Sequence, residues 1–293
     1  KSGMNYLSML YELSQKELGT ILTSQYQFAL FDVGSSSFSY DDASKFAAHC
    51  SVNLAISVAD DVPLFDFQKE AVEKLYENFV KNDRSNGLLV MPTGSGKTRT
   101  AVYFLLRHMV SQGYQIIWLT HRHMLIDQTA DAFFRFSPLV KLEKPTAKSF
   151  NMSCVSGLHM SVKASEKSDN VIILSIQSVA RSQEYLRSVL AKKVMIVVDE
   201  AHHSVARSYE NTIKSIRSIR KDAKLLGLTA TPVRGNESES KYLMHLYEGN
   251  IVYQESLSNL IRNGTLSEPV FEHIQTNNNF EHLISLDEEA FLK

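Results

Sequence analysis

The strongest indication of the fold is the sequence Met91-Pro92-Thr93-Gly94-Ser95-Gly96-Lys97-Thr98. It follows an apolar run at residues 87–91, typical of a buried strand, and it opens an amphipathic stretch at residues 98–110. Glycines between a strand and a helix let backbone N–H groups turn inward on phosphate oxygens, and the helix dipole adds to the attraction. The pattern therefore predicts a phosphate-binding loop. The alternative is a Gly-Ser turn before an ordinary helix.

Within this loop we expect Lys97 to reach the β- and γ-phosphates of ATP and the Thr98 hydroxyl to bind Mg²⁺. The usual G-x-x-x-x-G-K-[ST] pattern has glycine where Met91 stands, a departure that leaves the cradle itself intact. The full set of residues expected to contact the nucleotide here is Thr93, Gly94, Ser95, Gly96, Lys97 and Thr98.

Further apolar runs alternate with amphipathic stretches along the chain. The runs span residues 115–120, 171–175, 194–198 and 224–229, and the helical stretches span residues 66–80, 98–110, 124–136 and 206–219. Continuous apolar strands separated by helices predict an α/β fold, a parallel sheet with helices on both faces, whose ligands bind at the carboxyl ends of the strands. A small mixed α/β region precedes it, with a helix at residues 6–22, an apolar run at 26–33 and a loop at 34–37.

A second motif, Val197-Val198-Asp199-Glu200-Ala201-His202-His203, ends another apolar strand. Adjacent carboxylates repel each other, so a nearby metal ion gives the pair a physical reason. We expect Asp199 to hold Mg²⁺ and Glu200 to polarise the attacking water. An Asp-Glu pair that caps a helix is the alternative. A zinc site at the two histidines is disfavoured, because no cysteine or third histidine stands nearby at ligand spacing.

A third motif, Gly227-Leu228-Thr229-Ala230-Thr231-Pro232, lies at another strand end, and alone it is merely a threonine-rich turn. In this order the three motifs resemble those of superfamily 2 helicases: a Walker A loop, the DEAH form of Walker B and the T-A-T form of motif III. The resemblance spans residues 62–268 and implies a RecA-like P-loop NTPase lobe. It also implies that His202, Thr229 and Thr231 couple the γ-phosphate environment to the rest of the lobe.

Weaker matches extend the resemblance. Leu64-Phe65-Asp66-Phe67-Gln68 looks like the Q motif, which implies Gln68 on the adenine edge. Many relatives have arginine where Phe65 stands, so adenine would here meet an aromatic ring. The stretch that begins Thr120-His121-Arg122 resembles motif Ia, and Ser175-Ile176-Gln177-Ser178 resembles the next motif. In the family such motifs contact the nucleic-acid backbone, which implies that role for Thr120, His121, Arg122, Ser175 and Gln177. The alternative for each is an ordinary strand-to-helix turn.

The resemblance is closest to restriction translocases, which include type I and type III motor subunits, and to repair helicases. DEAD-box RNA helicases typically have P-T-R-E-L-A and S-A-T where this chain has T-H-R-H-M-L and T-A-T, which favours duplex DNA over RNA. An RNA helicase or duplex-RNA sensor is one alternative. A nucleotide-gated scaffold that does not hydrolyse ATP is another, against which Glu200 argues. A P-loop kinase would need an acceptor pocket and a lid, for which no candidate is visible.

Members of this superfamily have a second RecA-like lobe with a Q-x-x-G-R-x-G-R motif that supplies arginine fingers, and no stretch here resembles it. Residues 256–267 look like the family's exit from the first lobe. We therefore expect a fragment of a longer protein, with the second lobe as its partner. The expected parts are an accessory region of unknown role at residues 1–61, the ATP-binding lobe at 62–268, and the start of the connection to the second lobe at 269–293.

Composition narrows the class of protein. The chain has 293 residues, a formal net charge of −1 and 44% hydrophobic residues, which is ordinary for a globular protein without overall basicity. Cys50 and Cys154 form no C-x-x-C pair, so we expect a reduced, cytoplasmic protein with inert thiols. No apolar run approaches the roughly 18 residues that a membrane helix needs.

Overall fold

The computed structural model describes residues 63–137, 140, 149–157, 159, 165, 167–180, 183–231 and 237–268, and two short strands at residues 28–29 and 49–53. The predicted N-terminal helix at residues 6–22 and the loop at 34–37 lie outside these residues, as do residues 269–293 and Pro232 of the third motif.

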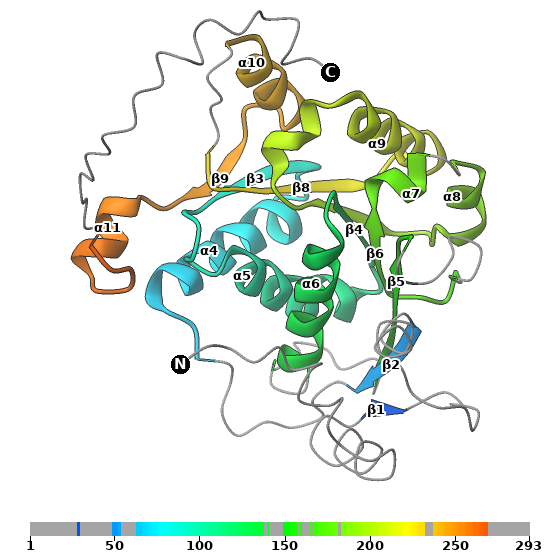
Figure 1. The fold of residues 1–293 in the computed structure, drawn as a ribbon, viewed down its shortest axis with the longest axis horizontal. Helices are drawn as coiled ribbons and strands as arrows, with labels where there is room; N and C mark the ends of the chain where they lie inside the picture. Colours follow the sequence, from blue (N-terminus) through cyan, green and yellow to red (C-terminus); the bar gives the residue numbers. More distant parts are fainter. Residues whose placement is uncertain are drawn as a thin grey trace, which may run out of the picture.

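In the described part of the chain, nine strands form a single sheet (Figure 1). Seven neighbouring strands run parallel; their spatial order is β5 (Ser149–Val155), β6 (Val171–Ser175), β4 (Gln115–Thr120), β7 (Val194–Val198), β8 (Lys224–Thr229), β3 (Asn86–Val90) and β9 (Ile251–Gln254). Antiparallel to β5 lies β2 (His49–Asn53), and β1 (Phe28–Ala29) pairs with β2. The predicted α/β fold with a parallel sheet is confirmed.

Helices cover both faces of this sheet (Figure 1). One face carries α4 (Asp66–Tyr76), α5 (Lys97–Phe104) and α6 (His123–Phe136). The other carries α7 (Ile176–Ala180), α8 (Gln183–Val189), α9 (Arg207–Ile219) and α10 (Glu237–Leu246). Beyond β9 follows α11 (Leu257–Arg262). Irregular turns lengthen two helices: π-helical residues 77–81 continue α4, and residues 105–112 continue α5.

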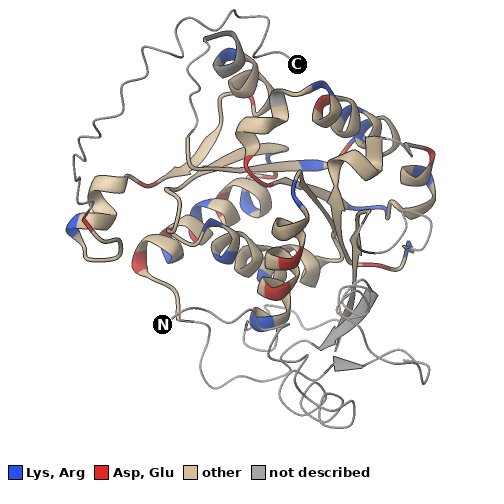
Figure 2. Cartoon of the chain, in the orientation of Figure 1, with Lys and Arg blue, Asp and Glu red and all other residues tan. Residues whose placement is uncertain are grey.

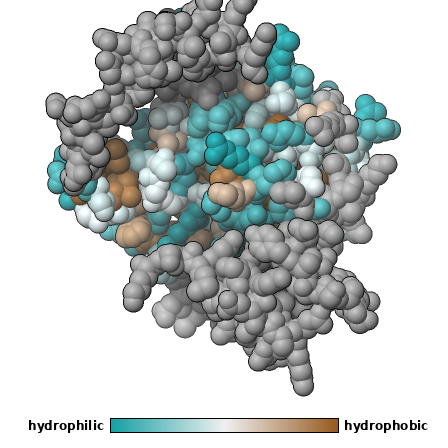
Figure 3. All heavy atoms as spheres, in the orientation of Figure 1, coloured by the Kyte–Doolittle hydropathy of each residue, from teal (hydrophilic) through white to brown (hydrophobic). Residues whose placement is uncertain are grey.

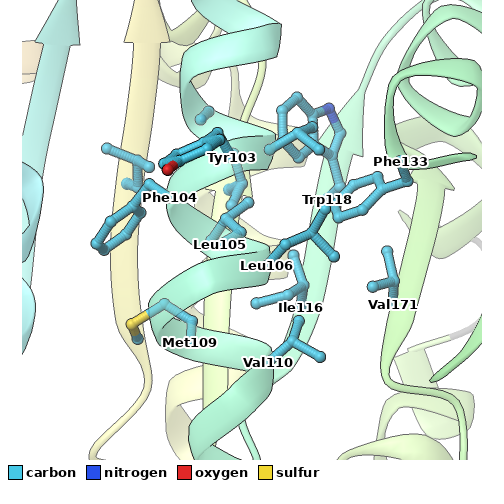
Figure 4. Close-up of a cluster of buried hydrophobic side chains, with 14 of the residues drawn as sticks. Tyr103, Phe104, Leu105, Leu106, Met109, Val110, Ile116, Trp118, Phe133 and Val171 are labelled. Atoms are coloured by element: carbon cyan, nitrogen blue, oxygen red, sulfur yellow. The ribbon is translucent and has the colours of Figure 1, made fainter. Parts of the chain in front are cut away.

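Side chains of each central strand alternate between two apolar cores. In β4, Ile116 and Trp118 belong to the core under α4, α5 and α6, whereas Ile117 and Leu119 belong to the core on the opposite face. Trp118 packs edge-on against Phe133 of α6, with ring centroids 6.1 Å apart (Figure 4). A shift of this strand by one residue would exchange the two faces, so the two cores together fix its register.

The structure adds elements that the apolar pattern does not predict. The bounds of β4, β6, β7 and β8 agree with the prediction, and β3 begins one residue earlier, at Asn86. The strand β5 alternates polar with apolar residues, Ser-Phe-Asn-Met-Ser-Cys-Val, and β9 has only four residues, half-buried at the edge of the sheet. Neither is a continuous apolar run, which explains why both were missed.

Candidate nucleotide site and adjoining strand ends

Parallel strands place their carboxyl ends at one edge of the sheet. Because β7, β8 and β3 are neighbours, the loops that follow them meet at one half of this edge, which we call the β3–β7–β8 edge. The loops after β5, β6 and β4 form the other half, the β4–β5–β6 edge. All three of the sharper motifs fall on the first half, and the two motifs similar to nucleic-acid-contacting segments fall on the second.

The glycine-rich loop has the backbone that a phosphate cradle needs. Gly94 and Gly96 have φ angles of +82° and +83°, which side chains rarely permit. A Cβ at Gly96 would also lie 2.6 Å from Gln68 Nε2, so a side chain there would displace the end of Gln68. Ser95 closes the turn, since its amide donates to the Pro92 carbonyl at 3.2 Å and its hydroxyl donates to the same oxygen at 2.6 Å. The helix α5 then begins at Lys97, directly after the loop.

Lys97 carries its charge into a buried position. Its ammonium donates to the Pro92 carbonyl at 3.4 Å, and the residue is 8% exposed. Burial lowers the pKa of Lys97, while the nearby carboxylates of Glu200 and Asp199 act to raise it. The loop after β3 and the loop after β7 are therefore close enough to interact electrostatically. Thr98, the next residue, is half-buried.

The carboxylate of Asp199 is buried, which disfavours its ionised form. It is 4% exposed, and burial, with a further contribution from Glu200, raises its pKa to about 6. The amide of Glu200, which donates to Asp199 Oδ1 at 3.0 Å, acts in the opposite direction, as do Lys97 and Trp118. A buried anion of this kind is stabilised by a cation, and carboxylate and hydroxyl oxygens are the ligands that Mg²⁺ prefers. The carboxylate oxygens of Asp199 and the hydroxyl oxygen of Thr98 are therefore suitable ligands for a magnesium ion.

Glu200 has a backbone that is rare for a residue with a side chain, since its φ is +50°. Such conformations cost on the order of 1 kcal/mol and gather at functional sites. Its carboxylate approaches His202, with 3.3 Å between Oε2 and Nδ1. The same His202 nitrogen lies 3.3 Å from the Thr229 hydroxyl. Thr229 donates to the Thr231 carbonyl at 2.9 Å and accepts from the Thr231 amide at 3.2 Å, so the second and third motifs join through His202.

The N-terminus of α4 is tied to the phosphate loop by one amide side chain. Gln68 accepts a hydrogen bond from the Phe65 amide at 3.2 Å and donates to the Ser95 carbonyl at 3.0 Å. Both polar ends of Gln68 thus have protein partners, and the residue is buried. Phe65 is 53% exposed and stacks on Phe67. Its ring is free to meet a flat ligand beside the loop.

The β4–β5–β6 edge holds the five residues predicted to contact nucleic acid. Thr120 is buried at the end of β4, His121 follows it, and Arg122 is exposed at the start of α6. The Ser175 hydroxyl donates to Gln177 Oε1 at 2.7 Å, and Gln177 Nε2 donates to the His121 carbonyl at 3.3 Å. The ends of β4 and β6 are therefore linked by hydrogen bonds.

A row of hydrogen-bonded polar side chains that the sequence pattern does not predict also lies on this edge. The Ser156 hydroxyl lies 2.6 Å from His159 Nδ1, and His159 Nε2 lies 2.7 Å from Asp127 Oδ1 of α6. The Asp127 side chain is 41% exposed, whereas Ser156 is 5% exposed, so solvent reaches the acid and not the hydroxyl. A nucleophilic serine would need the opposite arrangement, with an exposed hydroxyl. These hydrogen bonds instead attach the loop after β5 to α6. The spacing S-x-x-H alone gives no signal for it.

Among the described residues, no three His, Cys, Asp or Glu side chains gather in an arrangement that could hold a metal by themselves. A magnesium site does not need one, because Mg²⁺ keeps waters and takes phosphate oxygens beside one or two protein ligands. Across the same residues, none of the helices has the length and apolarity to span a membrane.

Known proteins are similar to this chain over the region that holds the motifs. The family described as "Type III restriction enzyme, res subunit" matches residues 61–234. The type I restriction enzyme EcoAI endonuclease subunit of Escherichia coli is 30% identical over 203 residues, 69% of this chain and 23% of that protein. ATP-dependent RNA helicase DHX58 of Mus musculus is 30% identical over 162 residues, 53% of this chain and 24% of that protein.

A solved structure shows the same fold. The helicase domain of Hef from Pyrococcus furiosus has a TM-score of 0.51 at 24% identity and covers 67% of this chain and 39% of that one. The chain spans about a quarter of the length of the two curated relatives above. The predicted resemblance to the restriction and repair branch of superfamily 2 is confirmed. With its match over residues 61–234, the chain belongs to the family of the type III restriction enzyme res subunit, and it contains the helicase-like ATP-binding domain of that family.

Proposed function

We propose that this chain is the first ATPase lobe of an ATP-dependent DNA helicase or translocase, which couples Mg-ATP hydrolysis to movement on duplex DNA. The observation that supports the proposal is that the buried Lys97 and Asp199 lie at strand ends of the same β3–β7–β8 edge, with the Glu200 amide bonded to Asp199. The two carboxylates act to raise the pKa of the lysine. Phosphoryl transfer to water requires a cation that binds the phosphates, a carboxylate for the metal ion and a carboxylate for the water, all beside the phosphate-binding loop.

Each residue has a role in the proposed hydrolysis. The amides of the loop at residues 93–98 and the ammonium of Lys97 hold the phosphates, while Phe65 packs on the base. Thr98 and Asp199 would hold a Mg²⁺ ion, which would supply positive charge to the phosphates. Glu200 accepts a hydrogen bond from the attacking water, which orients the water and draws off its proton. A nucleotide-gated scaffold that does not hydrolyse ATP has no need of such a carboxylate, so Glu200 favours hydrolysis.

The β4–β5–β6 edge is the proposed contact with nucleic acid. Its exposed donors, Arg122 and the Gln177 amide, stand at strand ends where they can meet phosphates rather than bases. The net charge of the chain is −1, and in Figure 2 the described basic and acidic residues are interspersed rather than gathered into one band. Figure 3 likewise shows hydrophilic and hydrophobic residues intermixed among the described residues on the side of the molecule that it displays. Binding would therefore depend on a few local donors.

The substrate is duplex DNA in this proposal, on the grounds of the T-H-R-H-M-L and T-A-T motifs and the likeness to a type I restriction subunit. A specific observation favours a second candidate, an RNA helicase or duplex-RNA sensor: a relative named as an RNA helicase is also 30% identical to this chain. Both candidates share the ATP site, so only the nucleic-acid partner separates them.

A second RecA-like lobe is the proposed partner of the site. An arginine finger stabilises charge on the transferred phosphoryl group and is typically worth about 10³–10⁵ in rate. Because no stretch of this sequence resembles the family's arginine-finger motif, we expect residues 1–293 alone to bind nucleotide but to turn it over very slowly. A protein that also carries the second lobe should hydrolyse ATP faster by that factor.

The deciding experiment compares ligands on one protein that carries both lobes. Steady-state ATPase rates would be measured without nucleic acid and with duplex DNA, single-stranded DNA and duplex RNA of one sequence. We expect the largest stimulation with duplex DNA. Stimulation by duplex RNA alone would move the protein to the second candidate. ATP binding without hydrolysis under all four conditions would instead favour the scaffold.

A further inference from the structure

Three imidazole rings form a continuous row across the middle of the sheet edge. His121 follows β4, and His202 and His203 lie in the turn Ala201–Val205 that follows β7. The ring centroids of His121 and His203 are 4.3 Å apart with an interplanar angle of 61°, and those of His202 and His203 are 4.3 Å apart at 44°. Because β4 and β7 are neighbours, this row, His121–His203–His202, bridges the β4–β5–β6 edge and the β3–β7–β8 edge.

The two ends of the row reach the two proposed sites. At one end, His202 Nδ1 lies 3.3 Å from both Glu200 Oε2 and Thr229 Oγ1. At the other end, the His121 carbonyl accepts a hydrogen bond from Gln177, and Arg122 is the next residue along the chain. His203 is the ring between them, and neither the proposed hydrolysis nor the proposed phosphate contacts uses it.

The middle ring is held on a fixed backbone. The His203 amide donates to the Glu200 carbonyl at 2.8 Å, and the His203 carbonyl accepts from the Ala206 amide at 3.0 Å. A displacement of His121 therefore presses on a ring whose own main chain is anchored to Glu200. Rings at this separation are in van der Waals contact, so the His203 ring cannot stay in place while its neighbour moves toward it.

The outer end of the row is ready to rearrange. Among the described residues, the buried atoms Thr120 Oγ1 and His121 Nδ1 have no hydrogen-bond partner. Leaving buried polar atoms unpaired costs free energy, so a change that gives them partners is favoured. A nucleic-acid phosphate at the end of β4 offers acceptor oxygens at that place. Burial and the nearby Arg122 lower the pKa of His121, while Glu200 acts to raise it.

We propose that His203 is a positioning residue that couples nucleic-acid contact at the end of β4 to the placement of Glu200, by stacking between His121 and His202. The inference rests on the proposed function, because it assigns a route between its two sites. Coupling between two ligands is reciprocal, so nucleic acid must change nucleotide affinity by the same factor as nucleotide changes nucleic-acid affinity. That factor is the quantity that His203 controls.

The test measures this factor directly in a protein that carries both lobes. The dissociation constant of a non-hydrolysable ATP analogue with Mg²⁺ is measured by calorimetry, alone and with saturating duplex DNA. We expect about a tenfold tightening in the wild type, within the usual range for coupled sites. In His203→Ala and His203→Asn the factor should fall to about one, with each ligand's separate affinity changed less than about twofold. His203→Phe keeps a ring in the row and should retain most of the factor.

The control is His245→Ala, which removes an exposed histidine of α10 outside the row and should leave the factor unchanged. Melting curves identify any variant that fails to fold, and the asparagine variant replaces alanine in that case. The inference is overturned if His203→Ala and His203→Asn keep the wild-type factor, if His203→Phe loses as much as they do, or if the wild type binds both ligands without coupling. Failure of the wild type to bind nucleotide refutes the proposed function itself, which is a different result.

Discussion

The two halves of the sheet edge hold polar groups in different ways. On the β3–β7–β8 edge the charges are buried: Lys97 and Asp199 lie inside the protein, and Glu200 has a left-handed backbone. On the β4–β5–β6 edge the ionised donor, Arg122, is exposed, and the buried Thr120 is neutral. Burying charge costs free energy that a bound ligand of opposite charge recovers, whereas an exposed charge costs little. Substitutions should therefore have large effects on the first half and small effects on the second.

The largest effect should come from Glu200→Gln, measured as steady-state ATPase in a protein that carries both lobes. The amide keeps the shape of the acid but cannot draw a proton from water, so hydrolysis should fall by about 10²-fold or more. Binding of Mg-ATP should remain, because Glu200 is not expected to touch the nucleotide. Turnover near the wild-type rate would remove Glu200 from this role.

Lys97→Ala should come next, with nucleotide affinity as the measured quantity. Hydrogen bonds to charged groups contribute roughly 1.5–3 kcal/mol, so we expect Mg-ATP to bind about 10- to 100-fold more weakly in calorimetry. The matched control is Lys214→Ala, an exposed lysine of α9 that pairs with Glu210 on the surface. Equal binding by the wild type and Lys97→Ala would mean that the nucleotide site is misplaced.

Asp199→Asn should reveal the cost of the buried carboxylate through the free energy of unfolding. The ordinary pKa of 3.8 rises to about 6 in the folded protein. Between these values the folded state holds a proton that the unfolded state has lost, so stability falls as pH rises and the loss is complete above about pH 6. Roughly two pKa units correspond to about 3 kcal/mol.

The asparagine variant lacks this titration. In denaturant titrations without Mg²⁺ it should match the wild type near pH 4 and be more stable above pH 6, by up to about 3 kcal/mol. Added Mg²⁺ should then stabilise the wild type and not the variant. Asp131→Asn, which alters an exposed ion pair on α6, serves as the control. Parallel pH profiles of wild type and Asp199→Asn would contradict the raised pKa.

The same contrast explains what the sequence could predict. The loops of the β3–β7–β8 edge follow continuous apolar strands, so local patterns placed Lys97, Asp199 and Thr229 at the ends of strands. The structure shows that these strands are neighbours. Contacts between segments that are distant in the sequence have no corresponding local sequence pattern. Trp118 acts on the pKa of Asp199 from the neighbouring strand, and the Asp127–His159 pair joins α6 to the loop after β5. Tertiary packing decides these contacts, and the residue types alone do not.

The smallest effect should come from Arg122→Ala on the β4–β5–β6 edge. Phosphate contacts carry no sequence information, so affinity for unrelated duplexes should fall by a similar few-fold amount in fluorescence anisotropy titrations. Each phosphate that a basic residue neutralises releases counterions, so the slope of log K against log salt should become shallower by about 0.9. The control is Arg135→Ala at the far end of α6, where the guanidinium pairs with Asp131 on the surface. A variant with altered sequence preference and an unchanged salt slope would show that Arg122 reads bases, and that this half of the edge does not act through phosphates.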